Sequence, residues 1–255
     1  MTEADGLDTR STEDILKEVE ARRRLPKPLG ERERRIVLFA DRTIYWLANH
    51  WLTLLNLVAV LYVGLPLLAP IFMVLEMPGP ARVVYAMYRP LCHQLPQRSW
   101  FLFGPQAAYP MSDLADLLRD SEVPSAFQAA FVGNAALGYK MALCERCTAI
   151  YGTIALAGMV YGVLRRRGNV PPMPIWAYVV FGIVPMLIDG GWQWLSYAVS
   201  LLLPQLPIDP HETTPVLRTV TGMLFGISTV WLAYPYVQET MDEFKETLQK
   251  RFGWE

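Results

Sequence analysis

Four apolar runs, each long enough to cross a lipid bilayer, constrain this chain more than any other feature of its sequence. They cover residues 51–75, 143–164, 175–197 or beyond, and 216–236. A helix needs about 20 predominantly apolar residues to cross the hydrocarbon core of a membrane. A helix on the surface of a soluble core would instead alternate apolar and polar residues with a helical period. The sequence therefore predicts an all-α integral membrane bundle of four transmembrane helices.

The composition agrees with this prediction and excludes one class of partner. Only 18% of the residues are charged and 53% are hydrophobic, whereas about 25% of the residues in a soluble domain are charged. The net charge of −1 gives no general attraction for nucleic acid, which cationic proteins bind through its phosphates. The lipid bilayer is the predicted partner, and a protein partner or a homo-oligomer is left open.

Three parts follow from the position of the apolar runs. Residues 1–45 form a polar N-terminal segment with a charged helix at residues 11–24 and an interfacial helix before the first span. Residues 46–237 form the membrane domain, in which residues 77–142 make a cap between the first two spans. Residues 238–255 are expected to form an amphipathic helix. No apolar stretch of the kind found in a cleaved signal peptide lies near Met1.

The distribution of basic residues predicts the orientation in the membrane. The N-terminal tail contains ten Lys and Arg residues, the loop after the second span contains three, and the C-terminal tail contains three. With four spans these segments share one side, and they hold sixteen of the 23 basic residues. Basic residues concentrate on the cytoplasmic side of membrane proteins. We therefore expect a multi-pass protein of the cell membrane with both termini in the cytoplasm and the cap on the outer face.

All three cysteines fall at that outer face, where they could form a metal or redox site. Cys92 precedes His93 in the cap, and Cys144 and Cys147 form a C-x-x-C pair at the start of the second span. In the first interpretation the three thiols bind zinc with His93, or alternatively His211, as the fourth ligand. In the second, Cys144 and Cys147 are a redox pair with Cys92 as a resolving thiol. In the third, two of the cysteines form a structural disulfide and one thiol is left over.

Polar residues at the same end of the spans are the candidates for catalysis. Asp189 and Gln193 lie one helical turn apart near the outer end of the third span, and Arg218 begins the fourth. Ionisable groups at membrane depth are costly and often mark function. The alternative is a structural ion pair between Asp189 and Arg218 that holds two spans together.

Small residues four apart predict where spans pack closely. Gly158 and Gly162 lie in the second span, and Gly222 and Gly226 lie in the fourth. Such pairs let the backbones of two helices approach each other, although they are frequent in membrane spans without a specific partner.

Together these motifs resemble the prokaryotic membrane family known as domain of unknown function 2085. The resemblance covers about residues 91–226, with alanine at position 149 where glycine is expected and an apparent insertion at residues 107–140. It implies a multi-span membrane protein and supplies no activity. The matching residues are Cys92-His93-Gln94 with Pro96, Arg98 and Ser99; Cys144-x-Arg146-Cys147-Thr148 with Tyr151 and Gly152; Asp189 with Gln193; and Arg218 with Thr221 and Gly222.

The leading hypothesis from the sequence is a zinc-binding membrane protein in which the metal joins the cap to the second span. Three thiolates and a histidine would close the coordination sphere, which is typical of a structural site. Two other hypotheses stay open. One is a thiol oxidoreductase that passes electrons to a membrane quinone, and the other is an assembly subunit that binds partners through its charged tails.

Overall fold

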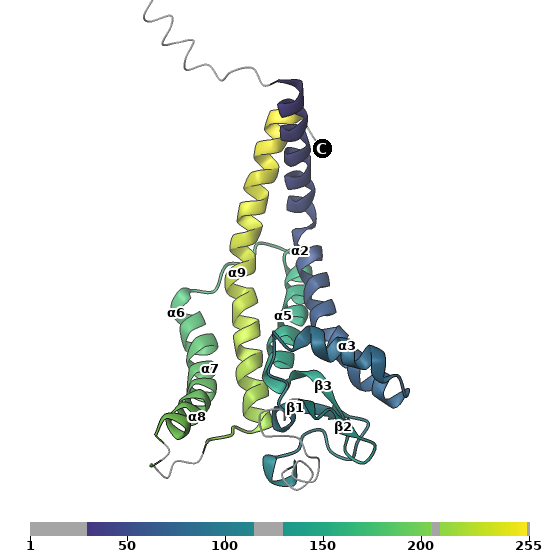
Figure 1. Cartoon of the computed structure of the whole chain (residues 1–255). Helices are drawn as coiled ribbons and strands as arrows, with labels where there is room; N and C mark the ends of the chain where they lie inside the picture. Colours follow the sequence, from purple (N-terminus) through teal and green to yellow (C-terminus); the bar gives the residue numbers. More distant parts are fainter. Residues whose placement is uncertain (1–29, 115–129, 204, 206–209, 254–255) are drawn as a thin grey trace, which may run out of the picture. The chain divides into compact units, whose positions relative to one another are not determined.

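The computed structural model describes residues 30–114, 130–203, 205 and 210–253. The charged helix expected at residues 11–24 lies outside this part of the chain, as do most of the acidic segment and part of the second outer loop. The chain divides into two compact units, Met1–Leu47 and Ala48–Glu255, and the cysteines and their surroundings lie in the second. The helices are α2 (Glu31–Val74), α3 (Pro78–Tyr88), α5 (Glu145–Leu164), α6 (Ile175–Tyr178), α7 (Val184–Met186), α8 (Trp192–Leu202) and α9 (Pro215–Phe252), seen in Figure 1.

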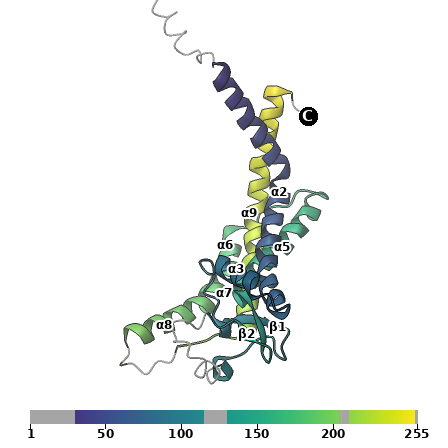
Figure 2. The same cartoon turned by 45° about the vertical axis from the view of Figure 1, so that its right-hand side comes forward.

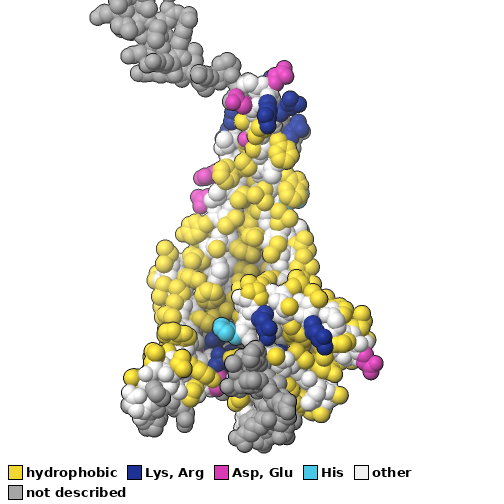
Figure 3. Space-filling view, viewed as in Figure 1, with side chains coloured by type: hydrophobic (Ala, Val, Ile, Leu, Met, Phe, Trp, Pro, Cys, Tyr) yellow, Lys and Arg dark blue, Asp and Glu magenta, His cyan; other side chains and the backbone are white. Residues whose placement is uncertain are grey.

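Four helical segments are long and apolar enough to cross a membrane, which confirms the predicted fold class. They are Glu31–Val74, Glu145–Leu164, Ile175–Leu202 and Pro215–Phe252. In the most apolar stretch of each segment only 17–33% of the residues are buried inside the chain. Figure 3 shows hydrophobic side chains over much of the visible face of these helices. Because so much apolar surface cannot face water, it requires a lipid environment.

Helices α5 and α9 pack against each other through glycine, as the small-residue pattern of α9 predicts. A Cβ at Gly226 would lie 2.6 Å from the carbonyl oxygen of Ile150, and one at Gly222 would lie 2.9 Å from the Cβ of Ala149. Only glycine permits such a close approach of two backbones. Position 149 has alanine where the family motif has glycine, but this does not prevent the contact, because Gly222 of α9 leaves room for the Ala149 side chain. The other pair faces α2 instead, since Gly158 lies against Asn56.

The third span is not a uniform α-helix. Two π-helical segments, η3 (Val179–Ile183) and η4 (Leu187–Gly191), interrupt it between α6, α7 and α8. Single π-helical turns are rare and occur frequently at functional sites. The second of them contains the candidate residue Asp189, which is buried.

The cap contains a small β-sheet that the sequence did not predict. Strands β1 (Ser99–Leu102) and β2 (Gly133–Asn134) pair with opposite edges of the central β3 (Gly138–Cys144), and both pairings are antiparallel. Gly138 has a φ of +80°, a conformation that favours glycine, at the turn into β3. The last residue of β3, Cys144, is also the residue that begins α5. The sheet thus places the cap directly at the start of a span.

A hydrophobic cluster attaches the rest of the cap to the same place. The buried face of α3 packs with Cys92 and with two residues of β3, Ala142 and Leu143. Figures 1 and 2 show α3 and the sheet near the end of α5 at which that helix begins. Helix α3 thus helps to position the first cysteine motif.

Candidate metal centre

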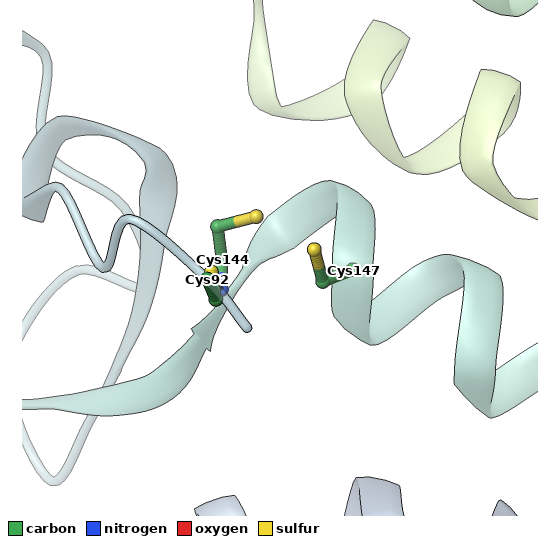
Figure 4. Close-up of side chains that lie close together, drawn as sticks. All are labelled: Cys92, Cys144 and Cys147. Carbon is green, nitrogen blue, oxygen red and sulfur yellow. Dashed lines mark hydrogen bonds between the residues drawn. The ribbon is translucent and has the colours of Figure 1, made fainter. Parts of the chain in front are cut away.

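The three cysteines converge in space, although Cys92 lies 55 residues before Cys147 in the sequence. Their sulfur atoms all lie within 4.8 Å of one another. Cys92 follows α3, Cys144 ends β3 and Cys147 lies in the first turn of α5. Figure 4 shows the sulfurs of Cys144 and Cys147 turned toward the same space. All three are free thiols, so no disulfide joins them in this structure.

Backbone hydrogen bonds hold Cys92 in place beside the other two cysteines. Its own N–H donates to the carbonyl of Tyr88 (2.9 Å), which fixes it to the end of α3. The N–H of Cys144 donates to the Cys92 sulfur at 3.2 Å. Hydrogen bonds from the thiols of Cys144 and Cys147 lower the pKa of Cys92. The geometry therefore favours a thiolate at Cys92, which is the form that binds a metal.

Neither candidate histidine belongs to this group. Within the described residues, the set of potential ligand atoms that lie within 4.8 Å of one another contains the three sulfurs alone. His93 is exposed and lines the pocket beside the sulfurs, whereas His211 lines a different pocket together with Asp189. The fourth ligand thus stays a prediction, and the described protein atoms in this cluster leave one tetrahedral position to be filled.

Two residues that were not among the predicted site residues, Gln94 and Lys140, support the Cys92 loop. Gln94 has a φ of +52°, and its side-chain amide donates to the carbonyl of Tyr85 at 2.8 Å. The ammonium group of Lys140 donates to the carbonyl of Gln94 at 2.5 Å. Lys140 is fully buried, and burial lowers the pKa of its side chain to about 7. The family motif includes Gln94, but nothing in the pattern shows that Lys140 points inward.

The predicted ion pair between Asp189 and Arg218 is wrong. Arg218 pairs with Glu145 at 2.9 Å and with Glu212 at 2.6 Å. Asp189 pairs with Arg146 and accepts a hydrogen bond from the hydroxyl of Thr221 at 3.1 Å. The reason is that the first turn of α5 supplies an acid and a base that lie nearer to these two residues than they lie to each other.

Glu212, in the loop before α9, connects the third and fourth spans to the cap. It accepts hydrogen bonds from Arg98 at 2.5 Å and from Gln193 at 2.5 Å, and one from the hydroxyl of Tyr197. Burial alone would raise the pKa of Glu212, but the hydrogen bonds from Arg98 and Tyr197 outweigh burial and lower it. The candidates Gln193 and Arg218 therefore meet at one carboxylate beside the cysteines.

These groups surround a pocket of about 200 Å³. All three cysteines lie in its wall. Asp189 is not part of this wall, although its partner Arg146 is. The remaining lining residues are Leu91, His93, Gln94, Leu95, Arg98, Arg146, Gln193 and Arg218.

Comparisons with known proteins agree with the sequence motifs. The uncharacterized protein MJ1492 of Methanocaldococcus jannaschii is 24% identical over 169 residues, which cover 66% of this chain and 73% of that protein. No solved structure gives a significant match. Residues 135–232 match the family described as "Predicted membrane protein (DUF2085)", a range that includes Cys144 and Cys147 but neither Cys92 nor Arg98. The resemblance is thus confirmed over residues 135–232, which are similar to the DUF2085 family of predicted membrane proteins.

Proposed function

We propose that this protein is a membrane metalloprotein in which Cys92, Cys144 and Cys147 bind one zinc ion. The convergence of the three sulfurs within 4.8 Å supports the proposal most directly. A tetrahedral zinc ion with Zn–S bonds of about 2.3 Å separates its sulfur ligands by about 3.8 Å. The thiols therefore need to move by only about 1 Å to reach that spacing, and thiolates are the ligands that zinc prefers.

The zinc ion adds a further link between parts of the chain that hydrophobic packing and hydrogen bonds already join. Cys92 belongs to the loop after α3, whereas Cys144 and Cys147 belong to β3 and the start of α5. A metal bound by all three fixes the cap to a membrane span. Metal binding to ligands that are distant in sequence contributes directly to the free energy of folding.

In this proposal the protein crosses the cell membrane four times and its termini lie in the cytoplasm. The excess of Lys and Arg in the two tails and the loop at residues 165–167 supports that orientation. The zinc centre then lies at the outer face. Three polar side chains line the same pocket as the cysteines, namely Arg98, Gln193 and Arg218. A purely structural zinc ion does not require hydrogen-bonding groups beside it.

Metal analysis of the detergent-purified protein tests the proposal. We expect about one zinc ion per chain, and we expect Cys92→Ser and Cys147→Ser each to abolish it because two thiolates hold the ion poorly. His211→Ala is the control, since this histidine lies in a different pocket and its removal should leave the zinc content unchanged.

The same preparation tests the thiol oxidoreductase hypothesis. That hypothesis requires a protein without bound metal and a disulfide between Cys144 and Cys147 that forms and breaks reversibly. Mass spectrometry after alkylation of free thiols distinguishes the two cases. A metal-free protein with this disulfide would overturn the zinc proposal.

A further inference from the structure

We propose that the pocket beside the cysteines binds a phosphate group, one oxygen of which occupies the fourth position of the metal. This inference rests on the proposed zinc site and assigns it a ligand. The wall of this pocket contains the three cysteines together with Arg98, Arg146 and Arg218.

The distribution of charge around this pocket favours an anion. Each of the three arginines is paired with a carboxylate, but none of those carboxylates lies in the pocket wall. Glu212 lines a neighbouring pocket, Asp189 lines another, and Glu145 is fully buried. The pocket wall thus contains the three arginines but none of the carboxylates that are paired with them. The first turn of α5 adds the positive end of a helix dipole beside Cys144.

Unused hydrogen-bond donors point to the same ligand. Within the described part of the chain, the Nε of Arg146 is buried and has no hydrogen-bond partner. A buried donor without a partner is costly, so a ligand that accepts its hydrogen bond would bind favourably. Arg98 contacts Glu212 through Nε and Nη2, which leaves the N–H groups of Nη1 available. The side chains of Arg146 and Arg98 are 20% and 24% exposed, and both line the pocket.

The number of donors and the size of the pocket favour phosphate over a carboxylate. A phosphate that binds the metal through one oxygen has three further oxygens that can accept hydrogen bonds from the arginines. A carboxylate that binds the metal in the same way has only one. Arginine also binds phosphate oxygens in pairs with its planar fork of N–H groups. A volume of about 200 Å³ is below the range of about 300–1,000 Å³ for whole drug-sized ligands. The pocket therefore fits a small anion or the headgroup of a larger molecule.

Two sources could supply such a group. Inorganic phosphate could enter from water, or the phosphate of an anionic lipid could enter from the bilayer. Leu91 and Leu95 add an apolar part to the pocket wall, and Leu91 is 57% exposed. Both sources present the same chemistry to the arginines and the metal.

Cobalt spectroscopy tests the inference separately from the zinc site. The detergent-purified protein is loaded with Co²⁺ in place of zinc and titrated with inorganic phosphate. Thiolate-to-cobalt charge-transfer bands report the three-cysteine site, and the d–d bands report the fourth ligand. We expect phosphate to shift the d–d bands in a saturable way while the charge-transfer bands persist. A parallel measurement compares nanodiscs that contain phosphatidic acid with nanodiscs of phosphatidylcholine alone.

Variants assign the response to the arginines. Arg98→Gln and the conservative Arg146→Lys should each raise the phosphate concentration at half-saturation by about tenfold or more, because each removes a charge-assisted hydrogen bond. Arg82→Gln is the matched control, since this arginine is exposed on α3 and does not line the pocket. Persistence of the charge-transfer bands in every variant shows that the metal site is assembled.

The possible outcomes separate the two proposals. Absence of thiolate-to-cobalt bands in the wild-type protein overturns the zinc site itself. Normal bands with no d–d response to phosphate or to phosphatidic acid overturn the phosphate pocket alone. An equal response in Arg98→Gln, Arg146→Lys and Arg82→Gln also overturns it. A response to phosphatidic acid without one to free phosphate supports the pocket and identifies a lipid as the source.

Discussion

Lys140 is a fully buried amine in the cap, close to the proposed metal site. Its pKa falls from 10.5 to about 7 in the folded chain because burial disfavours the charged form. Between about pH 7 and pH 10.5 the unfolded chain therefore binds a proton that the folded chain does not. The free energy of unfolding should rise with pH in that window, by up to about 1.4 kcal/mol per pH unit.

Chemical denaturation in detergent at pH 7.5 and pH 9.0 measures this effect. Lys140→Met should remove most of the difference between the two pH values. An equal pH dependence in the wild-type protein and in this variant would show that Lys140 keeps its ordinary pKa.

Glu212 is the carboxylate on which the cap, the third span and the fourth span converge. Glu212→Gln keeps the shape of the side chain but removes the negative charge that pairs with Arg98 and Arg218. We expect the free energy of unfolding to fall by about 2 kcal/mol, as is typical for hydrogen bonds to charged groups. Glu246→Gln is the control, because its pair with Lys250 is exposed and should contribute about 0.5 kcal/mol or less. Equal effects of the two substitutions would argue against a special role for Glu212.

At the scale of the elements, the contact between α5 and α9 depends on Gly226. An added methyl group would lie 2.1 Å from the hydroxyl of Thr153 and 2.6 Å from the carbonyl of Ile150, and the second of these is backbone that cannot move alone. Gly226→Ala should therefore lower the free energy of unfolding by about 1–3 kcal/mol. Thermal unfolding in detergent should show this loss. Gly64→Ala, where nothing lies within 4 Å, should be neutral or slightly stabilising, and a similar loss there would contradict the packing argument.

The sequence predicts the spans well because an apolar run of sufficient length has few alternatives in a membrane. It does not predict the sheet of the cap, because the two paired segments of β1 and β2 contain only four and two residues. Strands so short show no clear alternation of apolar and polar residues, and β1 ends at Leu102 whereas its partner β3 begins only at Gly138.

The meeting of the three cysteines could be predicted from the order of the spans, but the partners in the ion pairs could not. A topology of four spans places the cap and the start of the second span on one side, so the meeting of Cys92 with Cys144 and Cys147 follows from it. The ion-pair partners do not follow, because they depend on the rotation of each helix about its axis. A span such as α5 is apolar on every side, and its sequence therefore gives no face by which to fix that rotation. Hence Glu145 and Arg146 were missed as partners of Arg218 and Asp189.

For the whole molecule, the predicted orientation can be tested with reporters at both ends of the chain. Green fluorescent protein fused to either terminus should fluoresce, and alkaline phosphatase at the same positions should be inactive, because both termini are expected in the cytoplasm. The reason is the concentration of Lys and Arg in the tails and in the loop at residues 165–167. Active phosphatase at either terminus would place that end outside and would move the cysteines to the opposite face.

The central claim is that the three cysteines of this membrane protein bind one metal ion together. X-ray absorption at the zinc edge of the purified protein tests it most directly, because it reports the number and the type of atoms bound to the ion. We predict about three sulfur ligands at about 2.3 Å and one lighter ligand, with the sulfur signal lost in Cys92→Ser. A zinc ion bound only by nitrogen and oxygen, or a protein that contains no zinc at all, would contradict the account.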